Sequence, residues 1–175
     1  MVLLTGFGPF LDVRDNPSAR LVRRLHGRRV AGETLIGRVL PVSFERAPEE
    51  TLAVARGLGA RLVLGFGVAR GRGGVEVERL GRPGVGDAPD IDGCCPTSLG
   101  APGHPVSATV DVEALAAGLG AVLSEDAGRY VCNAWLYRVT HALEVPVGFV
   151  HLPPSGIAPE QVAGALARLL GGLQE

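Results

Sequence analysis

The amino-acid sequence predicts a single-domain α/β protein, a three-layer α/β/α sandwich with a mostly parallel mixed sheet. The chain has 175 residues, a length that suits one domain over 1–175 and can bury a sizeable core. Short apolar segments typical of buried strands alternate along it with segments of helical spacing. Such alternation is typical of a parallel sheet covered by helices on both faces.

Local signals place the individual elements. Asn16 and Pro17 mark a helix start, because asparagine is a good N-cap and proline fits the first helical position. Residues 75–80 alternate between polar and apolar, as a half-buried strand does. In chain order we expect a strand over 2–6, a helix over 16–25, a strand over 33–44, a helix over 47–59, strands over 61–68 and 75–80, a helix over 112–119, a short strand over 121–124, a helix over 133–143, a strand over 145–152 and a helix over 159–170.

Composition excludes several classes of protein. Hydrophobic residues make up 46% of the chain and the formal net charge is −1, a balance that argues against a nucleic-acid partner. The basic cluster at 23–29 favours the solvated end of a helix over a binding patch. No apolar run reaches the length of about 20 residues that a membrane span needs, and the N-terminus lacks the features of a signal peptide. We therefore expect no membrane partner.

The cysteines and one long segment give two further expectations. Three cysteines, an odd number, do not make a disulfide framework, so a cytoplasmic location is the simplest expectation. Residues 81–110 are rich in Gly, Pro and Asp and show no period. A loop of that length in a compact domain is expected to be functional or mobile.

Cys132 stands where a turn meets a predicted helix, within "DAGRYVCNAWLYRVTHAL" at 126–143. The unpaired backbone N–H groups of a helix N-terminus, together with the helix dipole, stabilise an anion. This position favours the thiolate, which is the nucleophilic form of cysteine. The alternative is a small buried hydrophobe beside a turn.

A base and an acid are available for such a thiol. His151 ends a predicted strand just before a Pro-Pro pair, which would hold an imidazole rigidly enough to act as a base. The alternative is a polar strand-end residue bonded to a backbone carbonyl. Glu76 and Glu78 share one face of the strand at 75–80 and Arg79 lies on the other. Either glutamate could orient the imidazole, or both could belong to a solvated face; the strand pattern does not choose.

The remaining histidines and two other motifs carry less weight. His26 lies in the basic cluster, His104 in the irregular loop and His141 well along a helix. "GFGVAR" at 65–70 fails as a dinucleotide fingerprint, since a strand pattern follows where a helix is required. The adjacent cysteines at 94 and 95 lack the two-residue spacer of structural zinc sites. We expect no metal and no cofactor.

Several motifs together resemble one family. They are "LLTGFGPF", "NPS", "LPVSF", "GFGVARGRGGVEVER", "AGRYVCN" and "GFVHLPPSGIAPEQ". They match, in the same order and over nearly the whole chain, the motifs of pyroglutamyl peptidase I, also called pyrrolidone carboxyl peptidase. The family consists of cytosolic cysteine peptidases with a single α/β/α domain that remove N-terminal pyroglutamate.

The resemblance implies roles for individual residues. Cys132 would be the nucleophile, His151 the base and Glu78, directly before arginine in "VEVER", the orienting acid. Peptides with a blocked N-terminus would be the substrates, and a homodimer or homotetramer the assembly. The resemblance assigns the lactam pocket and the wall beside the nucleophile to Phe7, Phe10, Asn16, Tyr130 and Val131.

Two departures from the family pattern affect specificity. Val68 stands where the family has a glutamine associated with holding the lactam. Loss of one hydrogen bond to a buried polar substrate would weaken recognition by about 1–3 kcal/mol. "LGRPG" at 80–84 replaces the family's Ala-Ile-Asn. Two alternatives follow: an amidase or omega-peptidase of the same fold with shifted specificity, and a non-catalytic protein that binds a small ligand.

Overall fold

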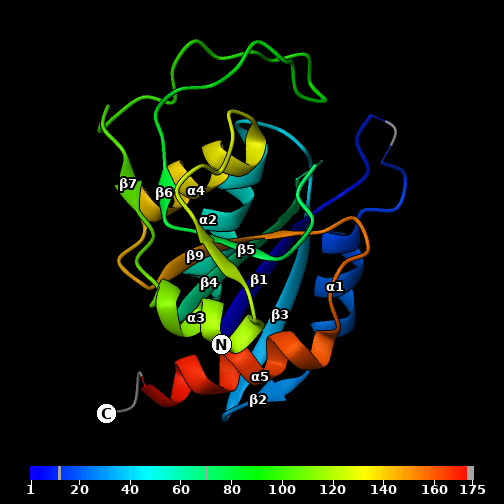
Figure 1. Cartoon of the computed structure of the whole chain (residues 1–175). Coiled ribbons are helices and arrows are strands. Elements are labelled where there is room, and N and C mark those ends of the chain that lie inside the picture. Colours follow the sequence, from blue (N-terminus) through cyan, green and yellow to red (C-terminus); the bar gives the residue numbers. More distant parts are fainter. Residues whose placement is uncertain (12, 70, 173–175) are drawn as a thin grey trace.

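A central sheet lies between two helical layers in the computed structural model, which describes residues 1–11, 13–69 and 71–172 (Figure 1). The strand order is β2-β3-β1-β4-β9-β5-β8. Neighbours β3, β1, β4 and β9 run parallel, as do β5 and β8, whereas β5 is antiparallel to β9 and β2 to β3. The predicted mostly parallel mixed sheet is confirmed. In sheet order the bounds are β2 (Arg29–Val30), β3 (Glu33–Leu40), β1 (Val2–Phe7), β4 (Leu62–Val68), β9 (Val147–Leu152), β5 (Glu76–Glu78) and β8 (Val122–Ser124).

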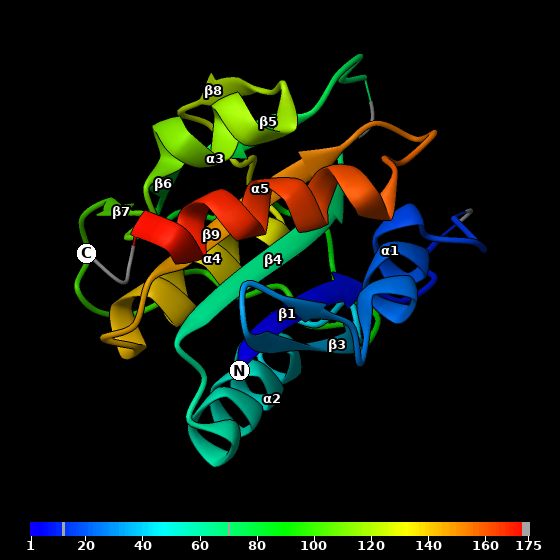
Figure 2. The same cartoon turned by 90° about the horizontal axis from the view of Figure 1, so that it is seen from below.

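Helices cover both faces of this sheet, as the view from below also shows (Figure 2). On one face lie α1 (Pro17–Leu25), α3 (Val112–Leu119) and α5 (Pro159–Gly172); on the other lie α2 (Arg46–Leu58) and α4 (Val131–Ala142). The strand period of two divides the buried side chains between two cores. Val150 packs in the core of α1, α3 and α5, whereas Phe149 packs in the core of α2 and α4. His151, two residues after Phe149, therefore faces the α4 side.

Capping explains where several helices begin and end. The Asn16 side chain accepts from the Ser18 N–H at 3.1 Å and caps α1, with Pro17 at its first position, as predicted. Gly59 closes α2 in the left-handed conformation. Helix α4 begins at Val131, two residues before the expected start. Cys132 thus lies inside its first turn.

The predicted strand over 75–80 is wrong as a single element. Strand β5 ends at Glu78, and β6 (Leu80–Gly81) leaves the main sheet to pair antiparallel with β7 (Val106–Ser107). Gly81 makes this path possible because it lies against α4: a Cβ there would sit 2.6 Å from the backbone nitrogen of Tyr137. The expected strand over 33–44 also ends early, at Leu40.

The long segment expected to be irregular is held against α4. The Asn133 side chain accepts from the Arg82 N–H and donates to the carbonyls of Arg82 and Gly84. Farther along, the Tyr137 hydroxyl donates to the carbonyl of Gly100. None of the helices in the described ranges has the length and hydrophobicity needed to cross a membrane.

Candidate active site

A cavity of about 270 Å³ opens where strand ends meet the N-terminus of α4. Phe7 and Val68 are the last residues of β1 and β4, and His151 is the penultimate residue of β9. Parallel strands bring their carboxyl ends to one edge of a sheet, where ligand sites of open α/β folds form. Eight of the nine residues expected at the site line the cavity: Phe7, Phe10, Asn16, Val68, Tyr130, Val131, Cys132 and His151. Glu78, the ninth, lies behind His151.

Cys132 occupies the second position of α4. The side chain of the N-cap residue Tyr130 makes no hydrogen bond to the N–H groups of the first turn. These donors, with the positive end of the helix dipole, are arranged to stabilise negative charge near the sulfur. The N-terminus of α4 therefore favours the thiolate form of Cys132, which is the nucleophilic form.

Glycines in β4 make room for this arrangement. A Cβ on Gly67 would lie 2.7 Å from Cys132 Sγ and 2.9 Å from the Phe149 ring. A Cβ on Gly65 would lie 2.7 Å from the Trp135 ring, deeper in the same core. Gly65 and Gly67 thus let α4 approach the sheet closely. In the sequence these glycines were considered only as part of a dinucleotide-binding motif, which did not predict this packing role.

His151 is oriented by Glu78. Its Nδ1 lies 2.7 Å from Glu78 Oε1, with His151 3% exposed and Glu78 fully buried. A carboxylate at Nδ1 places the proton of a neutral imidazole on that atom and leaves Nε2 as the base. Burial lowers the pKa of His151, but the side chains of Cys132 and Glu78 outweigh it and raise the pKa to about 9. The imidazole is thus held as an imidazolium at neutral pH.

The two candidate glutamates do different things. Glu76 lies directly opposite His151 in the β5–β9 register, yet its carboxylate pairs with Arg72. Glu78 makes the bond to His151, and a solvated strand face is the wrong description for this fully buried residue. Burial raises the pKa of Glu78. The hydrogen bond from His151 and the charges of His151 and Arg72 lower this pKa by more than burial raises it, so the net shift is downward.

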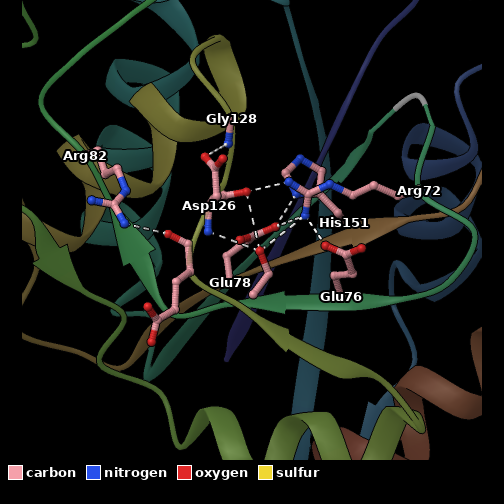
Figure 3. A network of polar contacts seen from close by, with 9 residues as sticks. Arg72, Glu76, Glu78, Arg82, Asp126, Gly128 and His151 are labelled. Atoms are coloured by element: carbon pink, nitrogen blue, oxygen red, sulfur yellow. Dashed lines mark hydrogen bonds and ion pairs between the residues drawn. The ribbon is translucent and has the colours of Figure 1, made fainter.

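Arg72 links the acid to its surroundings (Figure 3). Its guanidinium donates to Glu78 Oε1 at 2.7 Å, to Glu76 and to the Asp126 carbonyl. Arg72 also lines the cavity, and the sequence interpretation did not include it. The sequence signal that could have identified Arg72 is its place in a glycine-rich segment shortly before Glu78.

Aromatic rings form the other wall of the cavity. The Tyr130 ring lies 6.1 Å from that of Phe10 and packs edge-on at 5.4 Å against that of Phe44. The Tyr130 hydroxyl donates to the Pro89 carbonyl at 2.9 Å. Val131, also beside the nucleophile, is buried. Phe10 and Tyr130 line the cavity, and this largely apolar wall suits an uncharged ring.

Asn16 and Val68 bear on polar recognition. Asn16 caps α1 and donates through Nδ2 to the Gly8 carbonyl at 3.1 Å, so the α1 cap and the cavity wall share one side chain. Val68, which replaces the family glutamine, is partly buried and packs against the core beneath α1, α3 and α5. Its aliphatic side chain offers no hydrogen bond to a ligand.

The weaker histidine candidates are not among the residues that line the cavity. His26 Nδ1 accepts from the Gly37 N–H at 3.1 Å, and His104 and His141 are exposed. Other lining residues that the sequence interpretation missed are Val42, Ala69, Ala127, Gly128 and Arg129. Most of them belong to the turn before α4, whose backbone path the sequence pattern did not specify.

Comparison with known proteins agrees with this geometry. The family model described as pyroglutamyl peptidase matches residues 1–168. The chain is 35% identical over 170 residues to a pyrrolidone-carboxylate peptidase of Halalkalibacterium halodurans, covering 89% of this chain and 84% of that protein. It is 37% identical over 166 residues to one of Klebsiella pneumoniae, covering 87% and 77%.

A solved structure is also similar. The pyrrolidone carboxyl peptidase from Thermococcus litoralis superposes with a TM-score of 0.90 at 25% identity, over 99% of this chain and 94% of that one. The family match spans the strand ends, the cysteine helix and the histidine strand together. The chain belongs to the pyroglutamyl peptidase family.

Proposed function

We propose that this protein is a cysteine peptidase that hydrolyses the amide bond after an N-terminal pyroglutamyl residue, with Cys132, His151 and Glu78 as its catalytic residues. The observation that carries the proposal is the buried Glu78–His151 pair, with its 2.7 Å bond, beside a cysteine in the first turn of α4. A carboxylate that orients an imidazole next to a nucleophile is the general arrangement of acyl-transfer triads.

The chemistry follows from this arrangement. The Cys132 thiolate attacks the scissile carbonyl, and the first-turn N–H groups of α4 stabilise the oxyanion that forms. The His151 imidazolium gives its proton to the departing amine, which leaves a pyroglutamyl thioester on Cys132. The neutral imidazole then takes a proton from water. The resulting attack releases pyroglutamate and restores the thiolate–imidazolium pair.

Recognition would depend on shape and on few polar groups. Pyroglutamate is a neutral lactam without a free amine, so an acidic anchor for an amine would gain nothing from it. Phe10 and Tyr130 would cover the faces of the ring, which are apolar. One hydrogen of the Asn16 side-chain amide is donated to the Gly8 carbonyl. The other amide hydrogen would be donated to the lactam carbonyl. With Val68 at the glutamine position, packing would carry a larger share of specificity.

A fluorogenic pyroglutamyl amide tests the proposal. Wild type should hydrolyse it and Cys132→Ala should not, while the prolyl analogue, which has a free ring amine, should be a poor substrate. Equal rates for wild type and Cys132→Ala would refute the thiol mechanism. Turnover of a differently blocked amide in place of the pyroglutamyl one would favour shifted specificity instead.

Assembly is a separate part of the proposal. The family resemblance supports a homodimer or homotetramer, and size-exclusion chromatography with light scattering would measure the mass in solution. A mass equal to the 18.1 kDa chain at micromolar concentration would contradict it.

A further inference from the structure

We propose that Arg72 is the positioning residue of this site: it keeps the buried Glu78 carboxylate ionised and aimed at His151, and it fixes that carboxylate to the turn before α4. The proposal rests on the proposed function, since it concerns the same reaction. It assigns to a loop arginine a role that acts through Glu78, without contact with the reacting atoms.

The geometry at Glu78 is the first argument. His151 Nδ1 and an Arg72 terminal nitrogen both lie 2.7 Å from the same atom, Glu78 Oε1. A carboxylate held by two donors at one oxygen cannot rotate without breaking both bonds. Arg72 therefore restrains the orientation that His151 requires.

Charge is the second argument. Glu78 is fully buried, and an ionised carboxylate without a cation is costly in such a place. Within the described chain, the charged side chains bonded to it are Arg72 and His151, and Glu76 bonds the same Arg72 nitrogen as Glu78. Arg72 is the one of these cations that does not lose its charge in the working pH range. It keeps Glu78 ionised whether His151 carries one proton or two.

The remaining bonds of Arg72 reach the segment that leads into the nucleophile. It donates to Ser124 Oγ at 3.3 Å and to the Asp126 carbonyl. The Asp126 side chain in turn accepts a hydrogen bond from the Gly128 N–H at 2.9 Å (Figure 3). Gly128 lies three residues before the first residue of α4. One side chain thus ties the acid to the turn that sets the position of Cys132.

The same bonds argue against a role as substrate anchor. Arg72 lines the cavity, but its two terminal nitrogens already donate to acceptors on Glu76, Glu78, Ser124 and Asp126. Three of these acceptors share Nη1, so a substrate group that approached this nitrogen would have to displace one of them. We therefore expect changes at Arg72 to act on kcat and on the pH profile, with little change in KM.

The test compares Arg72→Gln and Arg72→Lys with Arg79→Gln. Arg79 pairs with Glu113 at the exposed surface, so its variant removes an equal charge next to Glu78 in sequence. Partners that orient a metal-bound histidine typically contribute about 10–100-fold to activity. For Arg72→Gln we expect a kcat loss in that range, a KM within about threefold of wild type and an acid limb of kcat/KM moved to higher pH. Arg72→Lys, which keeps the charge, should return the acid limb toward wild type and recover part of the rate.

A second readout needs no substrate. The rate of iodoacetamide modification of Cys132, followed by peptide mass, should persist at mildly acidic pH in wild type and Arg79→Gln and fall in Arg72→Gln. If wild type fails to cleave the pyroglutamyl amide, the proposed function fails and alkylation still decides the role of Arg72. If Arg72→Gln matches Arg79→Gln in kcat, acid limb and alkylation, the inference is overturned. A kcat loss with both pH profiles unchanged would also overturn it, and if Arg72→Gln does not fold, the profiles of Arg72→Lys decide.

Discussion

The two walls of the cavity are built in opposite ways. On one wall, His151, Glu78 and Arg72 form a chain of charged hydrogen bonds that is largely removed from solvent. On the other wall lie the aromatic rings of Phe10 and Tyr130, and the Tyr130 hydroxyl donates to the Pro89 carbonyl. Charged groups in a buried setting fix protonation and direction, whereas aromatic faces fix shape.

This difference separates chemistry from recognition. Changes to the charged wall should act on kcat and on pH dependence, because its groups differ between ground state and transition state. Changes to the aromatic wall should act on KM, because packing against the ring is the same in both states. Each variant below tests whether the two walls are as independent as their construction implies.

The largest effect is expected from Glu78→Gln. An amide can no longer support the imidazolium, and the corresponding change in other triads lowers kcat by about 10⁴-fold. We expect a loss of 10³-fold or more for the pyroglutamyl amide. Glu76→Gln is the matched control, since Glu76 pairs with Arg72 and not with His151. Equal losses in the two variants would show that the choice of Glu78 is wrong.

Gly67→Ala should come next. Its Cβ would meet Cys132 Sγ at 2.7 Å, and a displacement of about 1 Å at a reacting atom can lower the rate about 100-fold. Gly164→Ala, in α5 with nothing within 4 Å of the added carbon, should keep full activity and gain about 0.5–1 kcal/mol of stability. Steady-state kinetics and thermal melts check both, and full activity in Gly67→Ala would contradict the close approach.

A smaller effect is expected from the aromatic wall. Phe10→Ala removes one face for the ring, and apolar pocket contacts of this kind are worth about 1–3 kcal/mol. We expect KM to rise about tenfold with kcat within threefold. Val122→Ala, an exposed apolar residue on the edge strand β8, is the control for loss of an apolar side chain. A fall in kcat alone for Phe10→Ala would show that the two walls are coupled.

The smallest change is a shift in titration. For wild type, kcat/KM should fall as the pH rises through about 9, because the His151 imidazolium that protonates the leaving amine is lost there. Cys132→Ala removes one of the groups that raise the pKa of His151 and leaves the opposing burial in place, so this pKa should fall. NMR titration of the histidine ring signals would measure both proteins, and an unchanged His151 pKa would contradict the pairing.

The order of elements was predictable from the sequence because caps and periodicity are local. Asn16, Pro17 and Gly59 mark helix ends through their own backbone chemistry, and the continuously apolar strands are typical of a covered parallel sheet. The turn of the chain at Gly81 was not predictable, since its cause is contact with Tyr137, distant in sequence.

The site was predictable to the same extent. Strand ends and a helix start pointed to His151 and Cys132, but Glu76 and Glu78 share a strand face, so the strand pattern did not distinguish them. Family motifs favoured Glu78, and the structure places it on His151. Arg72 and Gly67 were missed because their roles arise from side chains that meet only in the folded protein.

Trapping the acyl-enzyme tests the central claim most directly. Wild type mixed with an activated pyroglutamyl ester, quenched in acid and digested, should carry a pyroglutamyl thioester on the peptide that contains Cys132 and none on the peptide with Cys94 and Cys95. His151→Ala should form this adduct more slowly and, because it lacks the base that activates water, should retain it longer. Turnover of the ester without any adduct on Cys132, or with full activity in Cys132→Ala, would contradict the account.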